Sequence, residues 1–368
     1  MHRRTPPQRR HGRGVRRPPA PAPGPHAGGP PRPGTRVSAT RRLPNQRARR
    51  VVALGGGHGL AASLSALRLL PTDLTGVVTV ADNGGSSGRL RTELGVLPPG
   101  DLRMALAALC GDDQWGRTWA DVLQHRFQTE GELHGHAVGN LLIAAVWERL
   151  GDHVAGLDLV GRLLGAQGRV LPMTSVPIEI TAEVVLHDQP GELTTIRGQV
   201  EVASTDGDVV SVSLEPSDPP ACPEAVEAIM AADDVVIGPG SWFTSVIPNL
   251  LVPELRDALV RTSAKRVLVL NLANQPGETD GFTAETHLEV LAAHAPELDI
   301  DVVLADDRVV DETGSLDAMV KGLGGRLVRT PVATSPQSDQ HDSLRLAAAF
   351  RRIFDELDDR GRGATGRW

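Results

Sequence analysis

The chain has 368 residues and a formal net charge of −7. No stretch approaches the roughly 18 consecutive apolar residues that a membrane helix needs, so the sequence predicts no membrane span. The two cysteines, Cys110 and Cys222, form no spacing motif and indicate a reducing cytoplasm.

The charge is divided unevenly along the chain. Residues 1–50 contain 14 Arg and no Asp or Glu. The remaining residues, 51–368, therefore hold 24 of the 38 basic side chains and all 45 acidic ones, which gives them a net charge of −21. With 11 Pro and 6 Gly, this head buries too little apolar surface to offset chain entropy, and we expect it to be disordered. It lacks the apolar run of a secretory signal. Two interpretations stay open: an unselected extension or misplaced start, or a basic arm that contacts nucleic acid or an acidic membrane surface.

The first predicted elements form a strand–helix–strand unit. A short apolar strand at Val51–Leu54 ends at three glycines, and leucines at helical spacing follow: Leu60, Leu64, Leu67 and Leu70. A second apolar strand, Gly76–Ala81, runs into a loop over Asp82–Gly88. This order predicts two parallel strands joined by a right-handed crossover.

Residues 100–166 are predicted to be mainly helical. Helices are expected at Leu102–Leu109 and near 117–127, 138–150 and 154–165. Partly alternating runs then predict a hairpin with a third strand, at 178–186, 193–202 and 209–214. We interpret residues 178–214 as an antiparallel insertion.

The α/β pattern returns in the last third of the chain. Strands are predicted at Asp234–Ile237, Arg266–Asn271, 301–305 and 326–329, followed by a closing amphipathic helix at Ser343–Leu357. We expect the tail from residue 358 to be loose. The sequence therefore predicts an α/β domain over residues 51–357.

The loop after the first strand is the first candidate for ligand binding. Its residues are Gly55, Gly56, Gly57 and His58. Glycine lets the backbone approach a phosphate, and the helix that follows offers free N–H groups. Residues 57–62 also fit the dinucleotide fingerprint, with Asp82 where a ribose-binding carboxylate would lie. A tight turn without a ligand is the alternative.

The second loop adds hydroxyl and guanidinium donors. Its candidate residues are Asp82, Asn83, Gly84, Gly85, Ser86, Ser87, Arg89 and Arg91. Two arginines on a glycine–serine loop of an acidic body favour phosphate binding. A flexible surface loop with solvated arginines is the alternative.

Polar candidates also occur further along the chain. Asp101 and Arg103 follow a helix entry, and a helix cap with a surface arginine is the alternative to a site role. His134 and His136 resemble a metal pair without an evident third ligand, so we interpret His136 and Asn140 as hydrogen-bonding residues. The ends of two later strands carry Gly238, Gly240, Ser241, Asn271, Asn274, Gln275 and Thr279. Because ligands of open α/β sheets lie over the carboxyl edge, these loops together predict one site, with the backbone of Gly240 and Ser241 as an anion nest.

Several enzyme classes lack their motifs here. There is no Gly-x-x-x-x-Gly-Lys-Ser/Thr, which excludes a P-loop NTPase, and no serine elbow or nucleophilic cysteine motif. No residue stands out as a general base. The sequence therefore predicts binding of a phosphate-bearing ligand, with no catalytic residue and no protein-held metal.

Six segments in order resemble the YvcK family. They are residues 55–60, 78–91, 98–103, 135–140, 238–241 and 275–279. Members of this family are called gluconeogenesis factors or UDP-N-acetylglucosamine-binding proteins, and they are related to CofD, the 2-phospho-L-lactate transferase of deazaflavin cofactor synthesis. The resemblance covers about residues 50–357 and leaves out the basic head.

The resemblance implies a Rossmann-like three-layer α/β/α fold with a mainly parallel sheet and a small antiparallel insertion. It also implies a cytoplasmic regulator that binds UDP-N-acetylglucosamine at the candidate residues above and acts on cell shape and wall-precursor supply during gluconeogenic growth. We expect a regulatory protein partner and a homo-oligomer. The family's usual Thr is His58 here and its usual Asp–Asp pair is Asp82–Asn83, which weakens the case for a metal-dependent transferase. Magnesium accompanying the ligand stays open.

Two other functions stay open. One is a CofD-type transferase that moves a phospholactyl-like group from a nucleoside diphosphate donor to a deazaflavin. The other is an NAD(P)-dependent oxidoreductase, which rests on the fingerprint at residues 57–62 and on Asp82.

Overall fold

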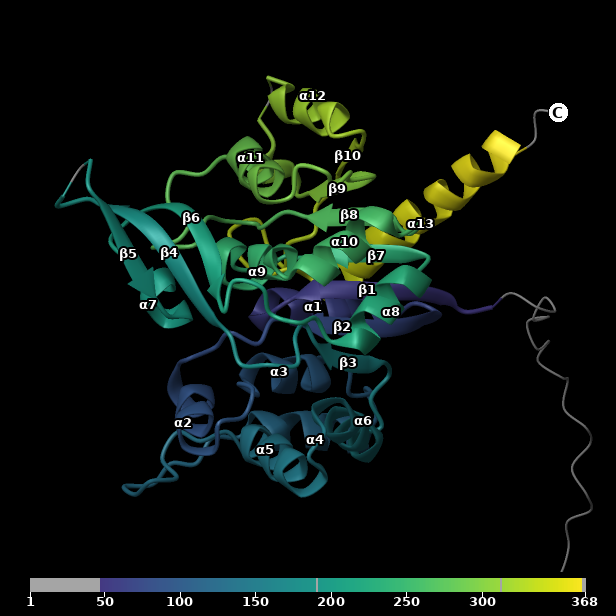
Figure 1. Ribbon diagram of the computed structural model, residues 1–368. Coiled ribbons are helices and arrows are strands. Elements are labelled where there is room, and N and C mark those ends of the chain that lie inside the picture. The colour runs from purple at the N-terminus through teal and green to yellow at the C-terminus, as the bar shows by residue number, and fades with distance from the viewer. Residues whose placement is uncertain (1–46, 190, 312, 366–368) are drawn as a thin grey trace, which may run out of the picture. The chain divides into compact units, whose positions relative to one another are not determined.

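A seven-stranded sheet, parallel throughout, organises the chain in the order β10-β9-β8-β7-β1-β2-β3 (Figure 1). The computed structural model describes residues 47–189, 191–311 and 313–365. The strands of this sheet are β1 (Arg49–Gly55), β2 (Thr72–Val78), β3 (Arg169–Pro172), β7 (Asp234–Ile237), β8 (Lys265–Val269), β9 (Val302–Ala305) and β10 (Arg326–Arg329). A buried parallel sheet of apolar strands confirms the predicted fold class.

Helices cover both faces of this sheet. They are α1 (Gly57–Leu67), α2 (Gly85–Leu94), α3 (Gly100–Ala108), α4 (Gln114–Gln124), α5 (Val138–Leu150), α6 (His153–Leu164), α8 (Pro223–Ala231), α9 (Ile247–Leu251), α10 (Pro253–Arg261), α11 (Ala284–His294), α12 (Ser315–Gly322) and α13 (Ser343–Thr365), with a π-helical turn η1 (Trp242–Val246) and a 3-10 turn η2 (Asp307–Val309). Starting from the centre of the sheet, the crossover from β1 to β2 and the crossover from β7 to β8 run in opposite directions. Because such crossovers are right-handed, α1 and α10 lie on opposite faces.

The predicted antiparallel insertion is confirmed as a separate small sheet. Its strands are β4 (Glu179–Leu186), β5 (Leu193–Arg197) and β6 (Gly207–Glu215), paired in the order β5-β4-β6. It lies to one side of the parallel sheet, at the left of Figure 1. The expected strand at 193–202 ends early, since Gly198 has φ +101° and the chain then turns into the short helix α7 (Gln199–Ala203).

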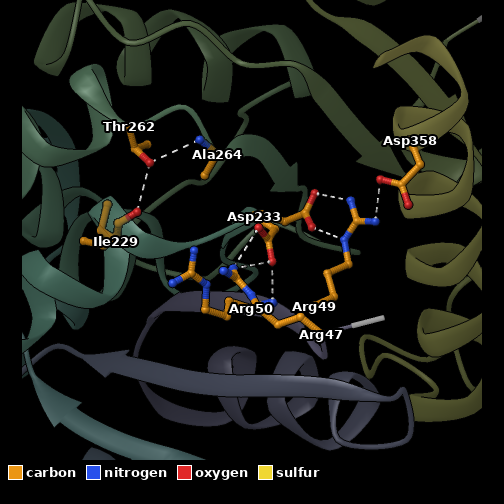
Figure 2. Close-up of polar contacts among 9 residues, drawn as sticks. Arg47, Arg49, Arg50, Ile229, Asp233, Thr262, Ala264 and Asp358 are labelled. Carbon is orange, nitrogen blue, oxygen red and sulfur yellow. Dashed lines mark hydrogen bonds and ion pairs between the residues drawn. The ribbon is translucent and has the colours of Figure 1, made fainter. Parts of the chain in front are cut away.

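Both ends of the folded region reach further than predicted. The head lies outside the described residues up to residue 46, but β1 already begins at Arg49, whose Nη2 donates to Asp234 Oδ1 at 2.9 Å. The same guanidinium pairs with Asp358 and stacks over the ring of Phe354, both on α13. Figure 2 shows Arg49 beside Asp358, together with the Arg47 side chain and the Arg50 backbone N–H that both donate to Asp233. These contacts explain why α13 continues past the predicted end at residue 357.

Two elements near the first turn also differ from the prediction. Strand β2 covers residues 72–78 rather than 76–81, because its register against β1 pairs Thr72 with Arg49 and Val78 with Gly55. The expected loop at 82–88 is helical from Gly85, where α2 begins. The candidate serines of that segment therefore lie in the first turn of a helix.

Candidate functional site

The switch point of the sheet lies between β1 and β7. From β1 the chain crosses to β2 on one side, and the later strands β7 to β10 extend on the other side. Open α/β sheets bind ligands beyond the carboxyl ends of the strands at such a point. The glycine turns after β1 and β7 both lie there, as the sequence predicted.

These two turns touch each other. Gly59, in the first turn of α1, has no room for a side chain: a Cβ there would lie 2.5 Å from Gly240 Cα and overlap the carbonyl group of Pro239. Gly57 has φ +54°, a conformation that favours glycine. Helix α1 begins at Gly57 without a side-chain cap and without an acidic residue in its first turn. The Gly57 N–H bonds the carboxyl of Asp101, and the following N–H groups of the first turn, with the partial positive charge of the helix, remain for a ligand.

On the β2 side of the first turn, polar side chains form a mostly buried cluster. We call it the buried polar cluster and define it as Asp82, Ser86, Ser87, Asp101, Arg103, His136 and Asn140. Ser86 Oγ accepts from Asn140 Nδ2 at 3.1 Å and lies 3.1 Å from His136 Nδ1. Asn140 Oδ1 in turn accepts from Arg103 Nε at 2.9 Å. The sequence predicted all seven residues as a site, and the structure brings them together.

The charges of this cluster perturb one another. Burial and the nearby carboxylate of Asp82 raise the pKa of Asp101 to about 7, against the opposing effects of a hydrogen bond from the Gly57 backbone and the charge of Arg103. Burial and the charge of Arg126 lower the pKa of Arg103 to about 10. Asp101 also lies against the first turn, since a Cβ on Gly56 would be 2.5 Å from its Oδ2. A carboxyl group that titrates near neutrality thus borders the N-terminus of α1.

The turn after β7 differs from the expected anion nest. The N–H of Gly240 donates to Asn271 Oδ1 at 2.9 Å, and Asn271 Nδ2 donates back to the Gly240 carbonyl at 2.8 Å. The hydroxyl of Ser241 donates to the buried carboxylate of Glu278 at 2.5 Å, and Thr244 donates to it at 2.7 Å. The Gly240 N–H and the Ser241 hydroxyl are therefore already used inside the protein.

A cavity of about 840 Å³ opens beside these turns. The predicted residues His58, Gly240, Ser241, Asn271, Asn274 and Gln275 line it. Sequence reasoning missed another part of its wall, the segment before α13, which contributes Asp339, Gln340, His341 and Ser343. Nothing in the local pattern of that segment marks it as part of a site, because only the packing of α13 against α1 brings it near β1. A smaller cavity of about 390 Å³ shares Asn271 and Asn274 with the large one.

Two side chains in the wall of the large cavity each contain a buried polar atom without a partner among the described residues. Gln275 Oε1 and His341 Nε2 are buried and make no hydrogen bond in the described part of the chain. A buried acceptor without a partner costs free energy, which a ligand N–H or O–H donor can recover. The cavity therefore has backbone donors at α1 and acceptors elsewhere in its wall.

Several predicted residues do not line the large cavity, among them all seven members of the buried polar cluster. Arg89 donates to the carbonyls of Glu132 and His134, and Arg91 lies on the same helix α2, so neither guanidinium lines the large cavity. The hydroxyl of Thr279 is fully buried and accepts from the backbone N–H of Gln275 at 2.9 Å. Arg89 and Thr279 thus make side-chain contacts within the protein, and none of the three residues lines the large cavity.

The described residues also bear on the predictions about metals and membranes. Within the described ranges, no three His, Cys, Asp or Glu side chains gather where they could hold a metal ion together. Asn83 turns its amide toward α7. The helices in this part of the chain are all too short or too polar to span a bilayer. Cys110 and Cys222 are buried and unpaired.

The comparisons with known proteins agree with this architecture. A Mycobacterium leprae protein, provisionally named a gluconeogenesis factor, is 55% identical to this chain over 304 residues. The match covers 82% of this chain and 84% of the relative. The chain belongs to the gluconeogenesis factor (YvcK) family. The Bacillus subtilis gluconeogenesis factor is 37% identical over 321 residues, covering 83% of this chain and 98% of that protein. The family described as 2-phospho-L-lactate transferase CofD matches residues 51–322.

A solved structure supports the fold of this family member. The crystal structure of a UPF0052 family protein from Bacillus halodurans superimposes with a TM-score of 0.73 at 34% sequence identity. The match covers 83% of this chain and all of the other one. The predicted relationship to YvcK and CofD is thus confirmed.

Proposed function

We propose that this gluconeogenesis factor is a regulator that binds UDP-N-acetylglucosamine in the 840 Å³ cavity. The observation that carries the proposal is the position of that cavity, at the switch point of the sheet and beside the uncapped N-terminus of α1. Its size is within the range of ligand-binding pockets, about 300–1,000 Å³. A ligand with an anionic centre and hydroxyl groups at its ends matches the donors and acceptors of its wall.

The N-terminus of α1 supports binding of the diphosphate. The first N–H groups of a helix have no intrahelical acceptor, and the helix dipole favours an anion there. His58 lies in this first turn and lines the cavity. The cavity wall contains no Lys or Arg among the described residues that form it, so backbone N–H groups would supply most of the anion contacts.

The unpartnered acceptors support binding of the sugar. Hydroxyl and acetamido N–H groups are donors that Gln275 Oε1 and His341 Nε2 could accept. The family resemblance extends the proposal to cell shape and wall-precursor supply, to a cytoplasmic setting, to a regulatory protein partner and to a homo-oligomer.

Titration calorimetry with UDP-N-acetylglucosamine, UDP, GDP and NAD tests this function. We expect saturable binding of UDP-N-acetylglucosamine, weaker binding of UDP because the sugar contacts are lost, and no comparable binding of GDP or NAD. Absence of heat with UDP-N-acetylglucosamine at millimolar concentration would refute the proposal. Tighter binding of NAD would favour the oxidoreductase instead.

One observation favours a CofD-like transferase as the second candidate. Asp101 titrates near neutrality beside the turn at Gly57, and a general base works best with a pKa near the operating pH. Incubation with a nucleoside diphosphate donor, a deazaflavin and magnesium, followed by mass spectrometry, tests this candidate. A deazaflavin product carrying the transferred group would support it, and an unchanged deazaflavin would exclude it.

A further inference from the structure

One short segment of the antiparallel insertion, between β5 and β6, lies against the candidate site. We call residues Gly198–Thr205 the strap; it contains α7 and connects β5 to β6. In Figure 1, α7 lies beside β4 and β5. Although the insertion is a separate sheet, the strap contacts loops from both sides of the switch point, the loop after β2 and the loop after β8.

The side chain of Asn83 holds the first end of the strap. Its Nδ2 donates to Glu201 Oε2 at 2.7 Å, and its Oδ1 accepts from the backbone N–H of Val200 at 3.0 Å. Val200 packs directly on the next glycine of the loop, because a Cβ on Gly84 would lie 2.7 Å from its Cγ2. One amide thus fixes both a side chain and the backbone in the first turn of α7.

The other end of the strap meets the loop that forms the cavity wall. Gly277 has φ +83°, and a Cβ there would lie 2.8 Å from the carbonyl oxygen of Ala203 and 3.3 Å from that of Thr205. The neighbours of Gly277 include Gln275 and Glu278, which line the cavity. Ala203 lines the cavity as well, so the strap is part of its wall.

Hydrogen-bond chemistry explains why an amide, and not a carboxylate, suits position 83. A neutral amide can donate to a carboxylate through one terminal atom and accept a backbone N–H through the other, which an ionised carboxylate cannot do. A carboxylate at position 83 would face Glu201 with the same charge and would lose the donated hydrogen bond. An amide at position 83 is therefore the residue type that suits the acidic side chain at position 201.

We propose that Asn83 is a positioning residue that clamps the strap over the cavity, so that docking of the strap controls how fast the nucleotide sugar leaves. This inference rests on the proposed function, because it assigns a regulatory element to the same cavity. Asn83 itself does not line the cavity. Its effect on the ligand acts through α7 and the Gly277 loop.

The test compares Asn83→Asp, Glu201→Gln and the double variant with the unchanged chain. Stopped-flow measurement of UDP-N-acetylglucosamine release and hydrogen exchange of residues 198–205 are the two readouts. For Asn83→Asp we expect at least about tenfold faster ligand release and faster hydrogen exchange in the strap. The carboxylates at positions 83 and 201 would repel each other and break the contact that holds α7. For Glu201→Gln, the rates of release and exchange should stay within about twofold of those of the unchanged chain, since the new amide keeps an acceptor for Asn83 Nδ2.

The double variant is the matched control for the clamp. In it, the carboxylate introduced at position 83 can accept from both the Val200 N–H and the amide introduced at position 201. Release and exchange should therefore return to within about threefold of the unchanged chain. The inference is wrong if Asn83→Asp releases the ligand at the unchanged rate, or if the double variant stays as fast as the single one. If the unchanged chain binds no UDP-N-acetylglucosamine, the proposed function fails, while the exchange data still show whether the clamp exists.

Discussion

Among single residues, Gly59 determines how closely the two glycine turns approach at the switch point. A methyl group at this position would overlap the Pro239 carbonyl and press on Gly240. We expect Gly59→Ala to lower the free energy of unfolding by about 1–3 kcal/mol, the usual cost of forcing extra volume into a packed site, and to weaken nucleotide-sugar binding. Urea unfolding and calorimetry measure the two effects.

Gly161 on α6 provides a matched control. It is also a helical glycine, but a Cβ there would lie 3.9 Å from its nearest neighbour, Leu106 Cδ2. Gly161→Ala should therefore be neutral or stabilising by up to about 1 kcal/mol. Equal losses of stability at positions 59 and 161 would contradict the close approach of the turns.

Asp101 predicts a pH dependence of stability. Burial and Asp82 raise its pKa to about 7, above the value of about 3.9 for an unfolded Asp. The folded state therefore binds this proton more tightly than the unfolded chain does. Its contribution to the free energy of unfolding is fully present below about pH 4 and is lost as the pH rises to about 7, by at most about 4 kcal/mol.

Urea unfolding between pH 4.5 and 7.5 tests this sign. The stability of Asp101→Asn should change less over this range than that of the unchanged chain, because the amide does not titrate. Identical pH profiles for the two proteins would show that Asp101 has an ordinary carboxyl in the folded state.

Of the residues predicted for the site, His58, Gly240, Ser241, Asn271 and Gln275 line the large cavity, and seven others form the buried polar cluster beside it. The buried polar cluster was predicted because its members follow glycine-rich or helix-entry signals. Arg89 and Arg91 lie on α2 and do not line the large cavity, a position that the local pattern could not show because it does not mark Gly85 as the start of a helix. Glu278 was missed for a related reason, since its burial against Ser241 depends on tertiary packing.

At the level of elements, Arg49 ties β1 to the neighbouring strand β7 through Asp234 and to the end of α13 through Asp358. The Asp234 side chain is 0% exposed and the Arg49 side chain 21% exposed. Asp234→Ala should lower the free energy of unfolding by about 3 kcal/mol, because it leaves a partly buried guanidinium without its main partner. Thermal and urea unfolding measure this loss.

The neighbouring pair of Arg47 and Asp233 serves as the control. Their side chains are 59% and 41% exposed, so Arg47→Ala should change stability by less than about 1 kcal/mol. If removing Arg47 destabilises the protein as much as removing the Asp234 side chain does, burial of the Arg49–Asp234 pair is not what stabilises β1.

Element boundaries show what the sequence pattern can and cannot predict. Helix α5 and strand β7 were predicted at their observed bounds, because each is a continuous apolar segment with clear breaks. Residues 198–202 of the strap were predicted as the end of the strand at 193–202, as part of a partly alternating run. Its helical turn depends on the side chain of Asn83, which is more than a hundred residues away in the sequence.

For the whole molecule, the strand order creates the site. The first strand–helix–strand unit was predictable, but no local pattern shows that β7 pairs with β1 on its other side. That pairing brings the turns after residues 54 and 237 together. The segment before α13 reaches the cavity wall through the packing of α13 against α1, which no local pattern shows either.

A crystal structure of the chain with UDP-N-acetylglucosamine tests the central claim most directly. The account predicts difference density in the 840 Å³ cavity, with diphosphate oxygens within hydrogen-bonding distance of the backbone N–H groups of His58 and Gly59 and the sugar toward Gln275 and His341. Density for the diphosphate at any other surface, with the N-terminus of α1 facing only solvent, would contradict it.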